Sequence, residues 1–416
     1  MTLEGTLGWR RNNAATMLTS FLLTATFSFT YPFLPLYIQQ IDGSTGQDAA
    51  MWAGISAGVQ GLGAFIAGPL WGMAGDRWGR KPMLVRACLG GATGLLLLGL
   101  ATSTWQIVAI RGFIGLMAGS AAAAMALVSA GTPDAQLPRA LGRLQGTMLA
   151  GLALGPVIAI AFVSAVGYRS TFIIAGVLMF SGSIVAMLAI REPRDTLASS
   201  RAAKPPSLRS VLRVPLTWAA LGLVLSLSFA GPMILPILSP YVATLLPEGA
   251  NLNLTVGLLF FGFSAASAFA AVYAGRAIQA FGIQRMLLIS TVGVAVFLLP
   301  MGLVSAVGAL AVLVVLMSLF QGTLQTASVA LLPTLVSATA LSSMFGLYQS
   351  VQALSSQMGP ALGGVIAAHI GFRAVFILAA LALLLLGLPM FWVFRRVAAR
   401  TQIADDIAEH DPHPLV

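Results

Sequence analysis

Residues 72–82 read Gly-Met-Ala-Gly-Asp-Arg-Trp-Gly-Arg-Lys-Pro and form a short charged segment between two long apolar runs. The run before this segment covers roughly residues 51–73, and the run after it covers roughly residues 81–101. A helix of about 20 apolar residues is long enough to cross the ~30 Å hydrocarbon core of a bilayer. Gly79 allows a tight turn, and basic residues favour the membrane surface. The segment therefore predicts two membrane helices joined by a short basic loop.

The same pattern of apolar runs and short polar loops extends over the whole chain. Of all residues, 58% are hydrophobic and 8% are charged, whereas soluble domains carry about 45–50% and about 25%. Lipid offers the backbone no hydrogen bonds, so each run is expected to be helical. The first run is too long for a signal peptide and is interpreted as a membrane helix. The twelve predicted helices cover roughly residues 14–38, 51–73, 81–101, 105–130, 141–165, 171–190, 216–243, 252–275, 284–306, 308–335, 341–368 and 373–395.

A long polar stretch, residues 191–215, divides these helices into two sets of six. It predicts an N-terminal six-helix bundle at residues 1–190 and a C-terminal bundle at residues 216–397. Residues 191–215 are then a cytoplasmic linker, and residues 398–416 are a cytoplasmic tail.

The basic residues indicate which side of the membrane each loop faces. With the N-terminus inside, 19 of the 22 Lys and Arg residues fall on the cytoplasmic side. Arg169 and Arg373 fall outside, and Arg111 lies within a helix. This asymmetry predicts that both termini are cytoplasmic. The net charge of +10 therefore reflects topology, and a nucleic-acid partner is not expected. The single cysteine, Cys88, excludes an internal disulfide.

The two halves of the sequence repeat each other. Glycine, proline and arginine keep one register across several helices, which chance matches between apolar segments do not produce. With six helices per half, the repeat is parallel and predicts a pseudo-twofold axis along the membrane normal, as in transporters that rock two bundles around a central site. At an offset of 204, Pro32, Tyr37, Gly155, Pro156, Gly167, Arg169 and Phe172 return as Pro236, Tyr241, Gly359, Pro360, Gly371, Arg373 and Phe376. At an offset of 203, Gly54, Gly72 and Gly79 return as Gly257, Gly275 and Gly282.

Residues 72–81 resemble the G-x-x-x-D-R-x-G-R-K signature of the major facilitator superfamily, at the position between helices 2 and 3 where that family carries it. Residues 111–115 resemble the family's R-x-x-x-G element. Residues 151–156 resemble the start of the G-x-x-x-G-P-x-x-G-G signature of drug antiporters, although Ala159 and Ile160 replace its final glycines. The chain as a whole is similar to bacterial twelve-helix drug:proton antiporters. The resemblance implies efflux of amphipathic drugs in exchange for protons.

Several residues of these motifs are candidates for coupling and gating. Pro156 bends its helix, and the glycines before it let helices approach closely, so both packing and gating remain open for this segment. Arg111 must find partners in the membrane because burying a lone charge is unfavourable; coupling and structural pairing with carbonyls remain open. The predicted set is Gly72, Asp76, Arg77, Gly79, Arg80, Lys81, Arg111, Gly155, Pro156, Gly359 and Pro360.

Asp76 is predicted to act as a latch between the halves. The matching residue of the second copy, 76 plus 203, is Gln279, so the acid occurs once. The resemblance places the start of helix 11, near Ser342 and Ser343, beside this loop in the outward-facing state. A helix N-terminus favours a carboxylate, so losing the charge should favour the inward-open state. The alternative is a local pairing with arginine.

The predicted central cavity is mainly apolar and aromatic with scattered amides. All 12 acidic residues lie in loops, at termini or at helix ends, so proton coupling comes only from the resemblance. His369 near a helix end could titrate or be structural. No phosphate loop, metal cluster or nucleophilic triad is present, and neither enzyme activity nor a cofactor is expected. The predicted substrate-binding residues are Phe27, Tyr31, Gln60, Met233, Phe260, Phe263, Gln321 and Gln325.

The sequence thus predicts a secondary active transporter, monomeric and surrounded by lipid in the cell (inner) membrane. It exports small amphipathic molecules in exchange for protons by alternating access. The alternatives are a carrier for a specific polar metabolite or a lipid-like substrate, and a membrane receptor or scaffold without transport.

Overall fold

The computed structural model describes residues 3–192, 215–331, 341–393 and 395–396, and every regular element in this part of the chain is helical. Ten helical stretches among the described residues are long and apolar enough to cross a membrane. Within a bilayer the helix satisfies its own backbone hydrogen bonds, which explains why apolar runs of this length fold this way. The prediction of an all-helical membrane protein is confirmed.

The first half of the chain contains three interrupted or bent membrane helices. The first is broken at Phe29, and the fourth is broken at residues 117–119. The longest helix runs on through Gly167, whose backbone is not helical (φ 77°, ψ 174°) and which separates two predicted helices. The elements are α1 (Leu3–Ser28), α2 (Thr30–Asp42), α3 (Gly46–Trp78), α4 (Arg80–Leu100), α5 (Thr104–Leu116), α6 (Ser120–Gly131), the short 3₁₀ helix η1 (Asp134–Gln136) and α7 (Leu137–Ala189).

The second half repeats the break in its first helix, where the 3₁₀ turn η2 separates α10 from α11. Most of the predicted linker at residues 191–215 and the whole predicted tail at residues 398–416 lie outside the described residues. The elements are α10 (Pro215–Ala230), η2 (Gly231–Ile234), α11 (Leu235–Leu245), α12 (Leu252–Phe281), α13 (Ile283–Met301), α14 (Val307–Ala330), α15 (Leu341–His369), α16 (Phe372–Ala382) and the π-helical turn η4 (Leu383–Gly387).

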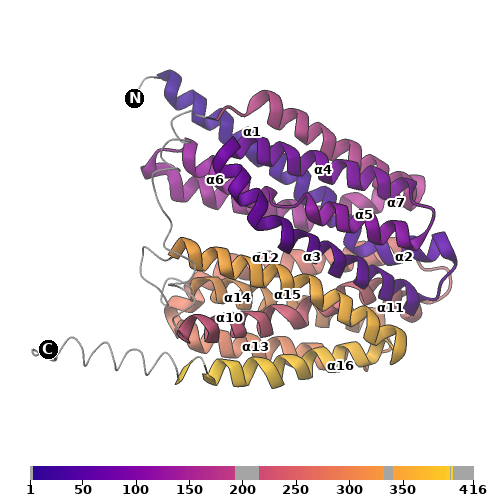
Figure 1. Cartoon of the computed structure of the whole chain (residues 1–416). Coiled ribbons are helices and arrows are strands. Elements are labelled where there is room, and N and C mark those ends of the chain that lie inside the picture. The colour runs from indigo at the N-terminus through magenta and orange to yellow at the C-terminus, as the bar shows by residue number, and fades with distance from the viewer. Residues whose placement is uncertain (1–2, 193–214, 332–340, 394, 397–416) are drawn as a thin grey trace, which may run out of the picture.

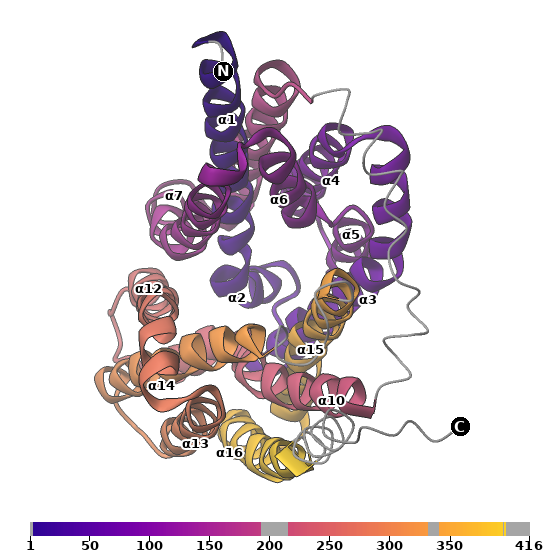
Figure 2. The same ribbon diagram turned by 90° about the vertical axis from the view of Figure 1, so that its left-hand side faces the viewer.

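The helices lie in two groups, α1–α7 in the upper part and α10–α16 in the lower part of the ribbon view (Figure 1). A view along the helices shows the same two groups (Figure 2). We call the end where α1 begins the proximal end, and the end where α2 finishes at Asp42 the distal end.

Equivalent residues of the two halves make equivalent contacts. The Tyr37 hydroxyl donates to the carbonyl of Leu98 (2.9 Å), and the Tyr241 hydroxyl donates to that of Met301 (3.1 Å). The ring centroid of Tyr37 lies 5.0 Å from that of Phe172, and the centroid of Tyr241 lies 5.2 Å from that of Phe376. These pairs are offset by 203 or 204 residues, so the sequence repeat is also a repeat of tertiary contacts.

Close contacts between the two halves lie at or toward the distal end. A Cβ atom added at Gly54 of α3 would overlap the carbonyl oxygen of Pro360 in α15. Reciprocally, a Cβ added at Gly257 of α12 would overlap Ile160 and lie 3.3 Å from the carbonyl oxygen of Pro156 in α7. Residue 54 matches residue 257, and residue 156 matches residue 360. Matching residues of the two halves therefore take part in the contacts between them.

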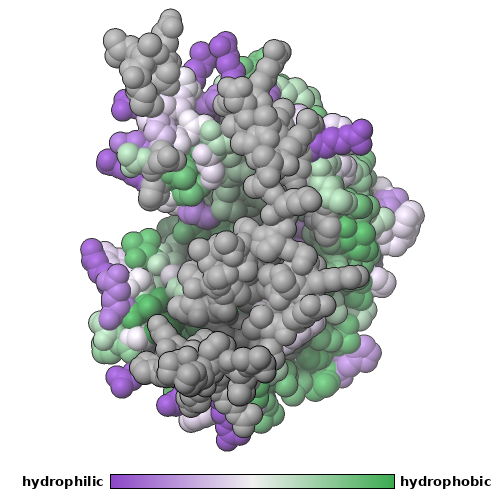
Figure 3. Space-filling model, turned by 60° about the vertical axis from the view of Figure 1, so that its left-hand side comes forward, coloured by the Kyte–Doolittle hydropathy of each residue, from purple (hydrophilic) through white to green (hydrophobic). Residues whose placement is uncertain are grey.

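Side-chain hydrogen bonds also join the halves at the distal end. The Ser239 hydroxyl of α11 donates to the carbonyl of Pro32 in α2. The Tyr168 hydroxyl of α7 donates to the side-chain oxygen of Asn253 in α12 at 2.7 Å. Toward the proximal end, the space-filling view shows a hollow between the upper and lower groups of helices (Figure 3). The two halves thus contact each other toward the distal end, and a hollow lies between them toward the proximal end on the face that Figure 3 shows.

The break between α5 and α6 is contacted by Arg86 of α4 and Trp71 of α3. The guanidinium of Arg86 in α4 donates to the carbonyl of Ala118 (2.9 Å), and the Trp71 indole N–H donates to that of Leu116. The Arg86 guanidinium also lies 3.7 Å from the centroid of the Trp71 ring. These donors satisfy carbonyls that the break removes from the helix ladder. The predicted membrane helix at residues 105–130 is present as one stretch long and apolar enough to cross a membrane, Thr104–Gly131, with an interruption at residues 117–119.

Candidate functional site

A cavity of about 290 Å³ lies between the two halves. Its walls come from α1, α2 and α7 of the first half and from α10, η2, α11, α12, α14 and α15 of the second. Tyr31 at the start of α2, Leu235 at the start of α11 and Pro156 of α7 line the cavity. The size is close to the lower end of the range for pockets that hold drug-sized molecules.

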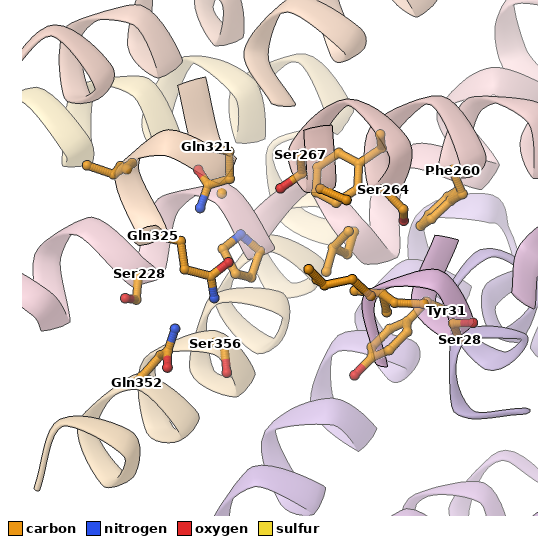
Figure 4. A pocket seen from close by; sticks show the side chains of 18 of the residues that line it. Ser28, Tyr31, Ser228, Phe260, Ser264, Ser267, Gln321, Gln325, Gln352 and Ser356 are labelled. Atoms are coloured by element: carbon orange, nitrogen blue, oxygen red, sulfur yellow. The ribbon is translucent and has the colours of Figure 1, made fainter. Parts of the chain in front are cut away.

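The cavity is polar without being charged. Among the described side chains, six serines, three glutamines and Tyr31 line it, and no lysine, arginine, aspartate or glutamate does. The remaining lining is apolar and includes Phe260 and Phe263. In the close-up, Gln321, Gln325 and Gln352 lie on one side of the cavity, and Tyr31 lies on the other (Figure 4). The cavity therefore offers amide groups on one side, hydroxyl groups of Ser28, Ser264 and Tyr31 on the other, and apolar surface between them.

Gln321 is held in the cavity wall by a close approach to Gly231. The side-chain oxygen of Gln321 would lie 2.8 Å from a Cβ at Gly231, so the absence of a side chain at Gly231 leaves room for the amide in this position. This oxygen is buried and accepts no hydrogen bond from the described residues. An unpaired buried acceptor is unfavourable, and a bound donor would relieve it.

The structure brings five of the eight predicted substrate-binding residues into this cavity: Tyr31, Phe260, Phe263, Gln321 and Gln325. Phe27 instead points toward Gly91 of α4, and the backbone of Gln60 packs against Gly115 of α5. Met233 is 2% exposed and packs through its backbone against Gly363 of α15. These three residues do not line the cavity.

Sequence reasoning missed most of the polar lining. Ser264 and Ser267 of α12 and Gln352 and Ser356 of α15 line the cavity, but serine is common in membrane helices and gives no distinctive signal. Gln352 could have been predicted as a lining residue, because an amide in a membrane helix is unfavourable unless it is paired or lines a polar space.

Arg111 lies behind the cavity in the buried interior. Its side chain is 2% exposed, and a guanidinium nitrogen lies 3.5 Å from the Thr30 hydroxyl. The guanidinium carbon lies 5.8 Å from the centroid of the Tyr31 ring, which lines the cavity. The guanidinium Nε is buried and has no partner among the described residues. Arg111 thus connects to the cavity wall through an aromatic ring and is not exposed to lipid.

The predicted gating glycines are packing positions in this conformation. A Cβ at Gly155 of α7 would lie 2.5 Å from the carbonyl oxygen of Ala25, and one at Gly359 of α15 would lie 2.5 Å from that of Phe229. These are again equivalent contacts at an offset of 204. In contrast, nothing lies within 4 Å of a Cβ at Gly72.

The loop between α3 and α4 is tied to the end of α7. Gly79, the one residue between the two helices, has φ 104°. The carboxylate of Glu192 accepts hydrogen bonds from the backbone N–H groups of Arg80 (2.6 Å) and Lys81 (3.0 Å). The Lys81 amine donates to the carbonyl of Met187 at 2.6 Å. Glu192 therefore caps α4 at its positive end, a role that the sequence motif did not indicate.

The described residues do not include the side chains needed to examine the predicted latch. The backbone of Asp76 is part of α3, but its side chain lies outside the described residues, as do those of Ser342 and Ser343. Arg77 and Arg80 both have interaction partners. The latch therefore stays a prediction.

Comparisons with known proteins identify what the chain resembles. A family model described as Major Facilitator Superfamily matches residues 16–255 and 233–414. The multidrug resistance protein MdtG of Enterobacter lignolyticus is 30% identical over 410 residues, which cover 98% of each chain. MdtG of Salmonella arizonae is 32% identical over 372 residues, 89% of this chain and 92% of the relative.

Solved structures share the fold at low sequence identity. A bacterial homologue of the human lysosomal transporter Spinster, described as inward-facing and unoccupied, aligns with a TM-score of 0.76 and 14% identity over 96% of this chain and 98% of that chain. The nucleoside transporter NupG aligns with a TM-score of 0.74 and 12% identity over 92% and 99% of the two chains.

Proposed function

The chain belongs to the major facilitator superfamily, and we propose that it exports drugs or other amphipathic molecules across a bacterial inner membrane. Full-length relatives that are about 30% identical are multidrug resistance proteins. The observation that carries the proposal is the uncharged, partly polar cavity between the two halves. Such a cavity binds amphipathic molecules through apolar contact and a few hydrogen bonds.

The proposal includes twelve membrane crossings. Residues 139–189 form one helical stretch of 51 residues, and the backbone of Gly167 interrupts it. A length of 51 residues fits two crossings of about 20 residues each. With α15 added, the spans number twelve. The matched contacts at offsets of 203 and 204 support two bundles, residues 1–190 and 216–397, related by a pseudo-twofold axis along the membrane normal.

We place the proximal end in the cytoplasm. The loop between α3 and α4 and the loop between α12 and α13, both proximal, carry arginines and a lysine, whereas Arg169 and Arg373 lie near the distal end. The positive-inside rule then orients both termini inward. With the distal end closed and the proximal end open, the structure corresponds to an inward-open state, and export requires alternation to the outward-open state.

The substrates best matched to this cavity are neutral amphipathic molecules. A permanent cation would find no carboxylate among the described side chains of the cavity, and an anion would find no lysine or arginine. The three glutamines can instead pair with hydroxyl, amide or carbonyl groups of a ligand, while Phe260 and Phe263 cover its apolar part.

Transport into proteoliposomes containing the purified protein tests this function. An inside-acidic gradient across oriented vesicles should drive proton-coupled movement of neutral amphiphiles, and collapsing the gradient should abolish accumulation. Amphiphile transport that does not depend on the pH gradient would contradict proton coupling and indicate a facilitator. No movement of any amphiphile, in protein that remains folded, would remove drug export.

Gln325→Glu should extend the substrate range to cations. Gln325 is exposed in the cavity, so a carboxylate there stays hydrated and charged. The electrostatic attraction between this carboxylate and a cationic drug should raise the ratio of cationic to neutral drug transport about tenfold. The measurement is transport of matched cationic and neutral drug pairs. Gln47→Glu, which adds the same charge at the distal end outside the cavity, is the control. An unchanged ratio in Gln325→Glu would show that the cavity does not hold the substrate.

A carrier for one polar metabolite is the second candidate, and the cluster of Gln321, Gln325 and Gln352 favours it. The two candidates differ in competition experiments. A multidrug exporter should be inhibited by chemically unrelated amphiphiles, whereas a specific carrier should respond only to analogues of one compound.

A further inference from the structure

A second pocket lies at the proximal end, apart from the central cavity. It has a volume of about 410 Å³ and is formed by the start of α1 and the start of α7. Three arginines line it: Arg10 from α1 and Arg139 and Arg143 from α7. Among the described side chains, no aspartate or glutamate does. Two helices that are far apart in sequence therefore bring three positive charges together around one space.

The rest of the lining suits a ligand that carries a negative group and an apolar part. Met17, Ala14 and Ala140 supply apolar surface. The indole N–H of Trp9 is buried and has no hydrogen-bond partner among the described residues. Gln136, the N-cap residue of α7, makes no capping hydrogen bond through its side chain. An unpartnered indole N–H and the positive end of α7 thus accompany the arginines.

The pocket lies at the level expected for phospholipid headgroups. The apolar run of the first helix begins near residue 14, and that of α7 begins near residue 141. The lining residues therefore lie around the start of both runs, where tryptophan and arginine are favoured at the interface. Arginine binds phosphate oxygens through parallel hydrogen bonds, and basic pockets between membrane helices on the cytoplasmic side bind acidic headgroups.

We propose that Arg10, Arg139 and Arg143 form a binding site for a phosphate group, such as the headgroup of an anionic phospholipid of the inner leaflet. The same chemistry would accept a soluble phosphate. The apolar floor at Met17 and Ala140 distinguishes the two sources, because it offers contact to an acyl chain that free phosphate lacks. The site is separate from drug transport in the central cavity.

Binding to the purified full-length protein tests the proposal. Native mass spectrometry gives apparent dissociation constants for phosphatidylglycerol and for a diacylglycerol with the same acyl chains. A thermal-shift titration with inorganic phosphate measures binding of the soluble anion. Each single change, Arg10→Gln, Arg139→Gln or Arg143→Gln, should weaken phosphatidylglycerol binding about fivefold, and the triple variant about a hundredfold. Diacylglycerol binding should not change. If the triple variant does not fold, the three single variants still decide the question.

Arg395→Gln is the matched control. The Arg395 guanidinium lies 5.5 Å from the Trp392 ring centroid, as the Arg10 guanidinium does from that of Trp9, but Arg395 does not line this pocket. Its loss should change binding less than twofold. If phosphate, and not phosphatidylglycerol, distinguishes the wild type from the triple variant, the site is a phosphate site for a soluble anion. Equal binding of both ligands by the two proteins, or an equal loss in Arg395→Gln, would overturn the proposal.

Discussion

Gly54→Ala should nearly abolish transport by preventing closure of the distal end. In the middle of an exposed helix the same change would stabilise a protein by roughly 0.5–1 kcal/mol. Here the added methyl group would overlap the carbonyl oxygen of Pro360, and a backbone atom cannot move aside as a side chain can. Overpacking of this kind costs about 1–3 kcal/mol. Since about 1.4 kcal/mol shifts a two-state ratio tenfold, a cost of about 1–3 kcal/mol should lower the statistical weight of the distal-closed state roughly 5- to 150-fold.

Cysteine labelling measures this shift. Ala57, 3% exposed between the halves, serves as the reporter when changed to cysteine in a Cys88→Ser background. External labelling with a membrane-impermeant maleimide should rise severalfold in Gly54→Ala. Gly68→Ala, on the same helix with nothing within 4 Å of the new atom, should label and transport like the parent. Gly257→Ala should have a smaller effect, because the side chain of Ile160 can shift. If Gly54→Ala is labelled to the same extent as the parent, the contact between Gly54 and Pro360 does not act as a gate.

Arg111→Met should reduce transport by roughly 10- to 100-fold while leaving the folded protein at least as stable. The guanidinium is buried, has a single long hydrogen bond to Thr30, and contacts no carboxylate among the described residues. Replacing a poorly compensated buried charge with an apolar side chain of similar volume is often neutral or stabilising. If Arg111 lowers the stability of the fold and transport still requires it, its role is functional. It would then act on the cavity through Tyr31 in the cavity wall. A coupling free energy of 1–3 kcal/mol corresponds to the expected loss.

The two readouts separate a functional role from a structural one. Thermal unfolding in detergent should give an equal or higher midpoint for Arg111→Met, and proteoliposome transport should give the loss. Arg111→Lys, which keeps the charge, should recover part of the activity. A lower midpoint together with a proportional loss of transport would show that Arg111 is structural. Unchanged transport would remove Arg111 from the predicted coupling residues.

The membrane helices could be predicted from the sequence because hydropathy and length are local properties. Transfer of an apolar residue to lipid depends on its own side chain, and the helix satisfies its own backbone. The family assignment was equally accessible, since residues 72–82 and the offset of 203 to 204 depend only on order along the chain. The family prediction is confirmed by the match to residues 16–255 and 233–414.

The direction in which each side chain points was not accessible in this way. Successive residues of a helix are about 100° apart, so a shift of one position moves a side chain from a cavity to a helix interface. Phe27 and Tyr31 are about one turn apart, yet Phe27 points toward Gly91 of α4 and only Tyr31 lines the cavity. The apolar pattern of a membrane helix does not reveal this face, because lipid and protein interior are equally apolar.

The sequence alone therefore determined that this protein is a helical membrane transporter of the major facilitator superfamily, and that its sequence contains two copies of one repeat. Only the tertiary structure decided which residues meet between the halves: the glutamines and serines of the cavity, the reciprocal contacts of Gly54 and Gly257, and the three arginines of the proximal pocket. The physical reason is that composition sets which segments enter the membrane, whereas packing between distant helices sets which polar groups face one another.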